Sequence, residues 1–484
     1  MKKSQWLLIA LVLILTFLLV YTPHYTDRFP KHIDEYHHIT EAIKLKQGEY
    51  KSGMAGLEIG FHIFLMMLYI VFRSNLILIY KFLPAIFACL SSLALFFLIY
   101  KKSNNFLIAL FSMMFFASIR SNVNVTGLWF FTPLTFSIPF IFLYIYFFTE
   151  GIEKQNKKFI LISIAIMTLL IFTHAISVLF AIPFLIIYSL IHYKYLIKQY
   201  KFFSIFLIIP IIAFLFYKFI RAIPMKRVIN DLIHSLQFRR GWGILELDIS
   251  FLLLYSLIGF ILAIFGIISI FIFMKKLQIK KYIIFILWPL SLLIFIFIFQ
   301  KTRISYLVPY QRNLYYFILS IPILSAFGLY YLILIFQSLI KDIQVNSKTK
   351  EFIQFALILI ISLLVFWYAF GSYAYTPKQI QPYRVIDNND YEALLFLQQQ
   401  EKGKVMAMPM TSVAIFPVSQ QKPVGTIAFY GNREDAESFF KSTSCESKQE
   451  LLEKHNIMYV FSKNPINCSY TSIYNKNNYI YKTK

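Results

Sequence analysis

The residues able to do chemistry gather in one polar stretch near the N-terminus, residues 30–62. Seven consecutive positions of that stretch hold five ionisable side chains: His32, Asp34, Glu35, His37 and His38. An apolar run precedes the stretch, and further apolar runs follow it. Ionisable groups held against a membrane usually serve chemistry or ligand binding. We therefore take this segment as the candidate active site.

Asp34 and Glu35 supply adjacent carboxylates. Neighbouring residues on a helix point about 100° apart, so the two carboxylates are not expected to meet one substrate atom. A carboxylate at a membrane surface can act as a general base or bind a divalent cation such as Mg²⁺ or Mn²⁺. We name both residues as catalytic candidates and Asp34 as the candidate metal ligand. The alternative is a solvated interfacial helix with an acidic N-terminal turn.

Histidines add candidate substrate-binding groups, of which we select His37, His62 and His174. The histidines at 32, 37 and 38 lack the i, i+4 spacing of strong zinc motifs, which disfavours a histidine metal site. His174 interrupts an apolar stretch at a predicted outer hairpin. It either faces the same outer cavity or is a polar turn residue.

Cations in two predicted outer loops, 221–250 and 301–313, depart from the rule that places positive charge inside. Phosphate binding would explain them, because the guanidinium fork matches phosphate oxygens. The alternative is contact with lipid head groups or with local carboxylates. The substrate-binding candidates from these loops are Arg239, Arg240, Arg303, Tyr310 and Arg312.

Composition predicts a polytopic α-helical membrane protein. The chain has 484 residues, of which 58% are hydrophobic and 14% charged. Apolar runs of membrane length recur from residue 5 to about residue 374. The net charge of +24 comes mainly from lysines in short connections, and no folded basic domain is evident, so we expect no nucleic-acid partner. Three cysteines argue against a disulfide framework or a cysteine-rich metal site.

Orientation follows from the lysine-rich connections, all of which should be cytoplasmic. The count of crossings agrees if the run 59–72 lies along the outer interface, since its 14 residues fall short of the ~20 needed to span. We predict about 11 transmembrane helices, a cytoplasmic N-terminus and an extracytoplasmic C-terminal domain. The alternative is that 59–72 crosses the membrane. The expected domains are a transmembrane domain, 1–374, with outer loops 22–75, 221–250 and 301–313, and a soluble domain, 375–484.

The C-terminal segment is predicted to form a small α/β domain. Helical patterns alternate with buried strands, and two short strands close a hairpin. The expected elements are helices 391–400 and 448–455, strands 405–408 and 457–461, and a hairpin of 471–474 with 479–481. Cys445 and Cys468 either pair outside the membrane or stay free.

This layout resembles the C-type glycosyltransferase superfamily, which includes oligosaccharyltransferases, protein O-mannosyltransferases and lipid A aminoarabinose transferases. The segment His32-Ile33-Asp34-Glu35-Tyr36-His37 looks like the acidic motif of their first outer loop. Gly60-Phe61-His62 looks like their juxtamembrane helix, and Arg312-Asn313-Leu314-Tyr315-Tyr316 looks like the start of one of their spans. The resemblance covers roughly residues 1–330 in layout and a handful of residues in motif.

The resemblance implies a sugar donor linked to polyprenyl phosphate and transfer on the outer face of the membrane. Asp34 would be the catalytic base or a metal-associated carboxylate. Arg239, Arg240 or Arg312 would stabilise the leaving phosphate. The soluble segment 375–484 contains no tryptophan, unlike the oligosaccharyltransferases with their tryptophan-rich signature. Transfer of one hexose or pentose to a glycan, lipid or protein acceptor fits better than N-glycosylation.

Two other functions remain open. One is a transporter or flippase for a lipid-linked glycan, and the other is a non-catalytic membrane assembly subunit. Ion-coupled transporters usually carry carboxylates near the membrane midplane, whereas no Asp or Glu lies inside an apolar run here. An assembly subunit would tolerate loss of Asp34, which an enzyme would not.

Overall fold

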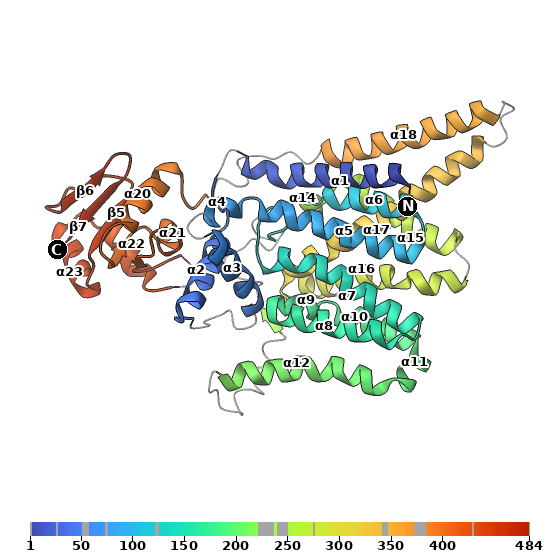
Figure 1. Cartoon of the computed structure of the whole chain (residues 1–484), viewed down its shortest axis with the longest axis horizontal. Coiled ribbons are helices and arrows are strands. Elements are labelled where there is room, and N and C mark those ends of the chain that lie inside the picture. Colours follow the sequence, from blue (N-terminus) through green and yellow to red (C-terminus); the bar gives the residue numbers. More distant parts are fainter. Residues whose placement is uncertain are drawn as a thin grey trace.

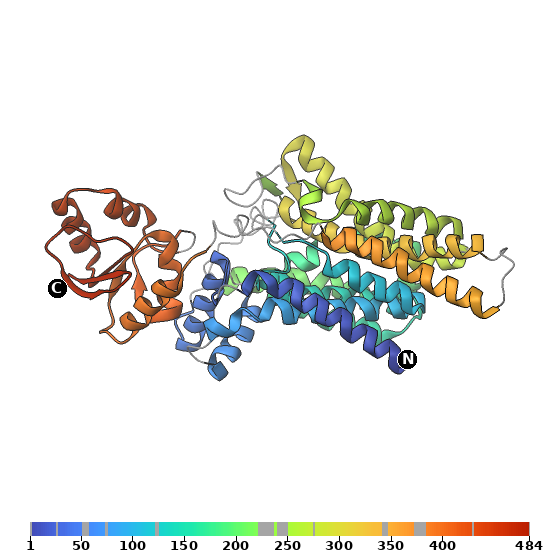
Figure 2. The same cartoon turned by 90° about the horizontal axis from the view of Figure 1, so that it is seen from above.

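A computed structural model describes residues 2–483, apart from 26–27, 51–57, 73–75, 122–124, 221–236, 240–249, 274–275, 341–346, 372–383 and 428–429. It is divided along its length into three parts (Figures 1 and 2). A helical bundle forms one end, a small α/β domain forms the other, and a group of short helices lies between them.

The bundle consists of helices that run side by side along the long axis (Figure 1). Its elements are α1 (Lys3–Tyr21), α5 (Leu83–Ser103), α6 (Phe106–Ala117), α7 (Pro133–Glu153), α8 (Lys157–His174), α9 (Ile176–Leu179), α10 (Ile182–Ile191), α11 (Tyr193–Lys198), α12 (Tyr200–Ile220), α14 (Phe251–Leu254), α15 (Leu257–Phe273), α16 (Lys276–Thr302), α17 (Tyr310–Ile340) and α18 (Ser347–Gly371).

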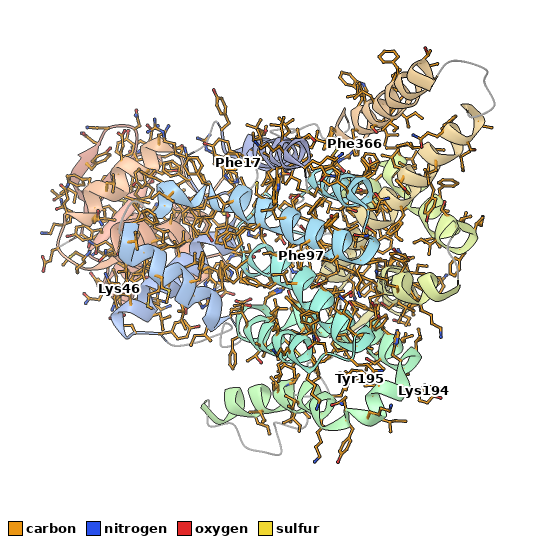
Figure 3. All side chains as sticks on the ribbon, turned by 45° about the vertical axis from the view of Figure 1, so that its right-hand side comes forward. Phe17, Lys46, Phe97, Lys194, Tyr195 and Phe366 are labelled. Atoms are coloured by element: carbon orange, nitrogen blue, oxygen red, sulfur yellow. A yellow bond between two sulfur atoms is a disulfide. The ribbon has the colours of Figure 1, made fainter. Side chains whose placement is uncertain are left out.

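The chain is a multi-pass membrane protein. Within the described residues, six helices are long and apolar enough to cross a membrane, namely α1, α5, α7, α8, α16 and α17. Many of their large apolar side chains face outward, as expected where lipid replaces water as solvent. The predicted total of about 11 crossings and the orientation of the termini stay predictions. Aromatic contacts fill the interior, as between Phe97, labelled in Figure 3, and Tyr146, whose ring centres are 4.7 Å apart.

Helices α15 and α17 approach each other closely because glycines face glycines. A Cβ atom added to Gly266 would lie 2.0 Å from the carbonyl oxygen of Leu324, and one added to Gly328 would lie 2.0 Å from that of Leu262. Only residues without a side chain allow two helix backbones to pack at this distance. The contact holds α17, which carries Arg312 in its first turn, firmly within the bundle.

Short helices form the middle layer between the bundle and the α/β domain (Figures 1 and 2). They are the 3₁₀ helix η1 (Thr22–His24) and the α-helices α2 (Ile33–Gln47), α3 (Ile59–Phe72) and α4 (Leu76–Tyr80). α3 has 14 residues, about 21 Å of helix, which is shorter than the hydrocarbon core of a bilayer. It packs against α2, and both lie at the end of the bundle, so its interfacial placement stays a prediction that the arrangement supports.

A two-stranded ribbon lies at the same end of the bundle. Strand β1 (Gln237–Arg239) pairs antiparallel with β2 (Ile304–Tyr306), and Phe238 is opposite Ser305. The ribbon therefore joins the two predicted outer loops, 221–250 and 301–313, by backbone hydrogen bonds. Most of the first loop lies outside the described residues.

The C-terminal domain is an α/β unit with five strands in the order β4-β3-β5-β7-β6. The expected helices, strands and hairpin are confirmed, with ends shifted by a few residues. The strands are β3 (Lys404–Met406), β4 (Lys422–Pro423), β5 (Tyr459–Ser462), β6 (Thr471–Asn475) and β7 (Tyr479–Lys482); the helices are α20 (Asn388–Gln398), α21 (Pro409–Ser419), α22 (Arg433–Lys441) and α23 (Cys445–His455).

Two features of this domain were not settled by the sequence. Strand β3 ends at Met406, before the predicted end at residue 408, and a helix that the sequence did not predict, α21, begins at Pro409, where the fixed φ suits a helix start and the missing N–H costs nothing. Cys445 and Cys468 form a disulfide, with their Cα atoms 5.7 Å apart. This resolves the open alternative in favour of pairing.

The α/β domain rests on the middle layer through α21, which packs against α2. Ile39 and Ile43 of α2 belong to the same buried cluster as Val413 and Ala414 of α21. The hydroxyl of Tyr430 donates a hydrogen bond to Glu41 of α2. Apolar contact and a partly buried hydrogen bond thus join the α/β domain to the helix that begins at the candidate active site.

Candidate functional site

Asp34 lies in the first turn of α2, where its carboxylate is accessible. The N-cap residue His32 accepts a hydrogen bond from the backbone N–H of Asp34 through Nδ1, at 3.1 Å. The same Nδ1 atom lies 3.4 Å from Oδ2 of Asp34, whose side chain is 32% exposed. Carboxylates are stabilised near a helix N-terminus by the unpaired backbone N–H groups. The side chain is therefore oriented by its helix yet open to an incoming molecule.

Glu35, the neighbouring carboxylate, is 0% exposed and accepts hydrogen bonds from backbone N–H groups. Its Oε2 atom accepts hydrogen bonds from the N–H groups of Lys31, at 2.7 Å, and His32, at 2.9 Å. Its Oε1 atom accepts one from the N–H of Phe131, at 2.8 Å. Glu35 thus forms a capping box and also fixes α2 to the segment that leads into α7.

Burial raises the pKa of Glu35 to about 7, although the hydrogen bonds from Phe131, His32 and Lys31 act in the opposite direction. The three hydrogen bonds that this carboxylate accepts come from backbone N–H groups of the protein. Its geometry suits a residue that positions the loop, and Asp34 is the better placed of the two to touch a substrate.

A second group of ionisable side chains comes from three short segments of the middle layer. His38 of α2, Glu58 and His62 of α3 place one potential ligand atom each within 4.8 Å of one another. Nδ1 of His38 lies 3.0 Å from Nε2 of His62, and Nδ1 of His62 lies 3.0 Å from the hydroxyl of Tyr50. Two imidazoles and a carboxylate are a common donor set for a divalent transition metal.

The protonation states of this group suit a metal ion. Burial lowers the pKa of His62 to about 3 and the pKa of His38 well below its ordinary value, so both rings are neutral and keep a lone pair. Burial, with a contribution from the charge of Asp34, raises the pKa of Glu58 to about 8, while Arg312 opposes that rise. A bound cation would offset the cost of ionising this carboxylate. The group is compatible with a divalent cation.

Sequence reasoning selected His62 for substrate binding but did not select His38 or Glu58. Glu58 and His62 have the i, i+4 spacing of two ligands on one helical turn, but the third group, His38, comes from another helix, α2. The available signals were therefore the Glu58–His62 spacing and the density of histidines on both sides of residues 39–57. The predicted metal ligand, Asp34, is outside this trio, although its charge acts on Glu58.

Arg312 enters the site from the first turn of α17. Its Nη1 atom donates hydrogen bonds to the carbonyl oxygen of Val125, at 2.7 Å, and to Oγ1 of Thr126, at 2.8 Å. The side chain is 8% exposed, and its charge acts on both Asp34 and Glu58. The structure therefore brings together the predicted carboxylate and one predicted cation from residues far apart in the chain.

His174 is buried at the end of α8, where Nδ1 lies 2.7 Å from Oγ of Ser177 and 3.3 Å from the hydroxyl of Tyr316. The charge of Arg312 acts on this ring, so His174 borders the same region. His37, also buried, lies with its ring centre 5.4 Å from that of Tyr430 in the soluble domain. Burial lowers the pKa of His37 to about 4.

The remaining predicted residues are less central. Tyr310 is buried and stacks on Phe299, with ring centres 4.1 Å apart. Arg303 is exposed next to β2 and has a positive φ of 57°. Arg239 ends strand β1, and the structure describes only its backbone, while Arg240 lies outside the described residues.

The helix that carries Asp34 is held along its whole length. At its far end Lys46, labelled in Figure 3, places its ammonium 4.9 Å from the ring centre of Tyr69 on α3. Gly48 ends the helix in a left-handed conformation, with φ of 74°. Contacts at both ends, with the buried face between them, keep the site rigid.

Comparisons with known proteins identify the fold. No family model and no curated protein matches the sequence. Solved structures do match, and those described below are 12% or 13% identical to this chain. The Archaeoglobus fulgidus oligosaccharyltransferase, tethered to an acceptor peptide with the NVT sequon, aligns with a TM-score of 0.61 and 12% identity over 96% of this chain and 69% of that one. ArnT of Cupriavidus metallidurans, an aminoarabinose transferase, aligns with a TM-score of 0.59 and 12% identity over 99% and 98%.

Another structure of the archaeal enzyme contains an inhibitory peptide and a dolichol-phosphate; it aligns with a TM-score of 0.59 and 13% identity over 96% of this chain and 69% of that one. Both matched proteins are C-type glycosyltransferases, so the resemblance predicted from the first-loop motif and the layout is confirmed. The chain has the fold of the C-type glycosyltransferases.

Proposed function

We propose that this protein is an integral-membrane glycosyltransferase that moves one sugar from a polyprenyl-phosphate donor to an acceptor at the outer face of the membrane. The observation that carries the proposal is the accessible carboxylate of Asp34, oriented at the start of α2 on the side of the bundle where Arg312 and the trio His38, Glu58 and His62 also lie. The fold shared with two sugar transferases supports it.

Asp34 is the general base in this proposal. An acceptor hydroxyl attacks the anomeric carbon of the donor, the new C–O bond forms, and the bond from that carbon to the phosphate oxygen breaks. The electron pair leaves with the lipid phosphate, and the hydroxyl proton passes to Asp34. A single displacement of this kind inverts the configuration of the sugar. A positioned base typically contributes about 10²–10⁴-fold to such a step.

Arg312 stabilises the charge that develops on the departing phosphate. Its guanidinium has five N–H donors, and Nη1 is the atom that bonds to Val125 and Thr126. Those bonds hold the group in place so that it needs no rearrangement during the reaction. Arg239 and Arg240 stay candidates for the same task, and Glu35 acts by positioning α2.

His38, Glu58 and His62 would hold a divalent cation. A bound cation would supply Lewis-acid stabilisation of the donor phosphate. The two imidazoles favour a zinc-type metal over Mg²⁺, which prefers oxygen ligands. This choice differs from the sequence expectation of Mg²⁺ or Mn²⁺ at Asp34. The archaeal oligosaccharyltransferase has also been solved in complex with Zn and sulfate.

Transfer of a single hexose or pentose, rather than of an oligosaccharide to Asn sequons, remains our proposal for the reaction. The soluble segment lacks tryptophan, and the chain matches ArnT over nearly the full length of both proteins. The acceptor is a glycan, a lipid or a protein.

A turnover assay tests the function. Purified protein in nanodiscs is incubated with a panel of radiolabelled polyprenyl-phosphate sugars and an acceptor extract. We expect one donor to be consumed by the wild type and by Glu434→Gln, an exposed carboxylate of the soluble domain, but not by Asp34→Asn. Consumption by Asp34→Asn at the wild-type rate would remove the site assignment. Failure of the wild type to consume any donor would favour the transporter or assembly-subunit functions.

A further inference from the structure

The soluble domain has the strand connections of a doubly wound sheet. β3 lies between β4 and β5 and is parallel to both. The chain leaves β3 through α21 to reach β4 on one side, and it then passes through α22 and α23 to reach β5 on the other side. The direction of winding therefore reverses between β3 and β5. In open sheets of this kind, ligands bind beyond the carboxyl ends of the strands at such a reversal.

Helices cover both faces of this sheet, as that arrangement requires. Val405 and Ala407 belong to the buried cluster that includes Ala414 of α21. Met406, which points to the opposite face, belongs to the cluster that includes Phe439 of α22. The two layers leave the carboxyl ends of β3 and β5 as an open edge between them.

A cavity of about 810 Å³ lies at this edge. Met408, Met410 and Thr411 line it from the segment after β3, and Ser462 and Asn464 line it from the end of β5 and the residues beyond. Its volume is within the range of about 300–1,000 Å³ that small-molecule sites occupy. The cavity is thus where the strand connections predict a ligand.

The lining has positive charge and hydrogen-bonding groups. Arg384, Lys441, Lys448 and Lys463 all contribute to it, and none of the described lining residues is acidic, although Lys441 pairs with Glu437 and Lys463 with Asp390. Hydroxyls come from Thr411, Ser442, Thr443 and Ser462, and amides from Asn464 and Asn467. Phe440 lies among these polar groups and is half-buried, so part of its ring is available for contact.

Several of these groups are held in place. Nζ of Lys463 lies 2.7 Å from Oδ2 of Asp390, and Nζ of Lys448 donates a hydrogen bond to the carbonyl oxygen of Ser442, at 2.5 Å. The disulfide between Cys445 and Cys468 ties the segment after β5 to the start of α23. A site whose groups are ordered before binding loses less entropy when the ligand arrives.

We propose that this cavity binds an anionic saccharide, a sugar chain bearing carboxylate or phosphate groups, and that it is the acceptor of the transfer reaction. Cations receive the anionic groups, hydroxyls and amides bond to the sugar hydroxyls, and the ring of Phe440 packs on an apolar sugar face. A dinucleotide does not fit the same edge, because the segment after β3 is Ala407-Met408-Pro409 and lacks the glycines that let a backbone approach a pyrophosphate. The acceptor role rests on the proposed transferase function.

Binding to the full-length protein in detergent tests the site. The probes are oligogalacturonate, which carries carboxylates, a phosphorylated oligomannose, and neutral maltohexaose, with affinity measured by isothermal titration calorimetry. We expect at least one anionic probe to bind and maltohexaose to bind at least about tenfold more weakly. The carboxylate and phosphate arms show which anion is preferred. Equal binding of all three probes, or of none, would overturn the proposal.

Paired variants locate the binding. Arg384→Gln with Lys441→Gln removes two exposed cations of the cavity, and we expect about tenfold weaker binding of the anionic probe. Lys454→Gln with Lys476→Gln removes two exposed lysines that do not line it, and binding should stay unchanged. Equal losses in both pairs would show a general charge effect and contradict the site.

The same probes separate this inference from the proposed function. Asp34→Asn should bind the anionic saccharide like the wild type, because Asp34 is in the middle layer and not in the cavity. Saccharide binding without any donor consumption would contradict the transferase function while supporting the site. Donor consumption unchanged by the Arg384 and Lys441 substitutions would support the transferase and contradict the acceptor site.

Discussion

Charged side chains are buried at both ends of the bundle, but the groups that surround them differ between the two ends. At the end of α5 that lies far from the middle layer, Lys102 is 0% exposed and pairs with Glu150, at 3.0 Å, and Glu153, at 2.8 Å. Lys154 pairs with the other oxygen of Glu150, at 2.6 Å, and Tyr188 donates a hydrogen bond to Glu153. Opposite charges there neutralise each other within one compact group.

At the end next to the middle layer, the charge of Asp34 acts on Glu58 and Arg312, and the charge of Arg312 acts on Glu58. His38 and His62 share that region as neutral rings. A self-contained ion network at one end is what a structural role requires. Buried groups with shifted pKa values, such as Glu58 and His62, gather at the other end, and such groups concentrate at binding and catalytic sites.

The largest effect on turnover should come from a substitution at the end of the bundle next to the middle layer, where Asp34 is accessible. Asp34→Asn should lower turnover by about 10²–10⁴-fold, because it removes the proposed base while keeping the shape of the side chain. The thermal unfolding midpoint should change little, since the carboxylate is partly exposed. A turnover assay with a melting curve measures both, and Glu434→Gln is the control. A large loss of stability with normal turnover per folded molecule would make Asp34 structural.

At the opposite end of the bundle, around Lys102, a substitution should lower stability and leave turnover nearly unchanged. Lys102→Met leaves two carboxylates in a buried region without their central cation, which costs about 3–5 kcal/mol of folding stability. Turnover per folded molecule should stay near normal. Chemical unfolding in detergent measures the change, and Lys101→Met, an exposed neighbour, is the control. Unchanged stability would show that the inner network is not structural.

Metal binding distinguishes the two ends further. His62→Ala should reduce bound zinc, measured by mass spectrometry of metal content, by at least about tenfold. His455→Ala, a histidine of the soluble domain outside the trio, should retain the wild-type content. An identical metal content in the wild type and His62→Ala would remove the trio as a metal site, whatever the activity of either protein.

Replacing the cation tests donor binding. Arg312→Lys keeps the charge but loses the guanidinium fork that bonds to Val125 and Thr126, so we expect roughly tenfold weaker donor binding. Lys301→Arg, on an exposed lysine near β2, serves as the control. Donor affinity equal to that of the wild type would limit Arg312 to holding the 125–126 segment.

The last difference to test is a pH dependence of stability. The pKa of Glu58 is about 8 in the folded protein and near 4.5 when unfolded, so the folded state holds the proton more tightly. Its contribution is therefore fully present below pH 4.5 and is lost as pH rises through 8. Melting curves of metal-free wild type should decline across this window more than those of Glu58→Gln. Identical slopes would show that Glu58 ionises freely.

Much of this architecture was predictable. Hydropathy predicted a multi-pass helical membrane protein, and local patterns located α20, β3, α23, β5 and the β6–β7 hairpin. The motif around Asp34 predicted the fold family. The burial of Lys102 was not predictable, because a lysine at the end of an apolar helix is buried only when carboxylates from another helix meet it.

The sequence by itself determined the properties that depend on near neighbours: which segments are apolar, where helices start, and that the ionisable residues of the first outer loop are concentrated around Asp34. The tertiary structure alone decided which groups meet. Glu35 is held by Phe131, 96 positions away, and His38 meets Glu58 and His62 only because α2 and α3 pack together. The physical reason is that a charged or polar group is paired according to packing between distant segments, which a local pattern does not contain.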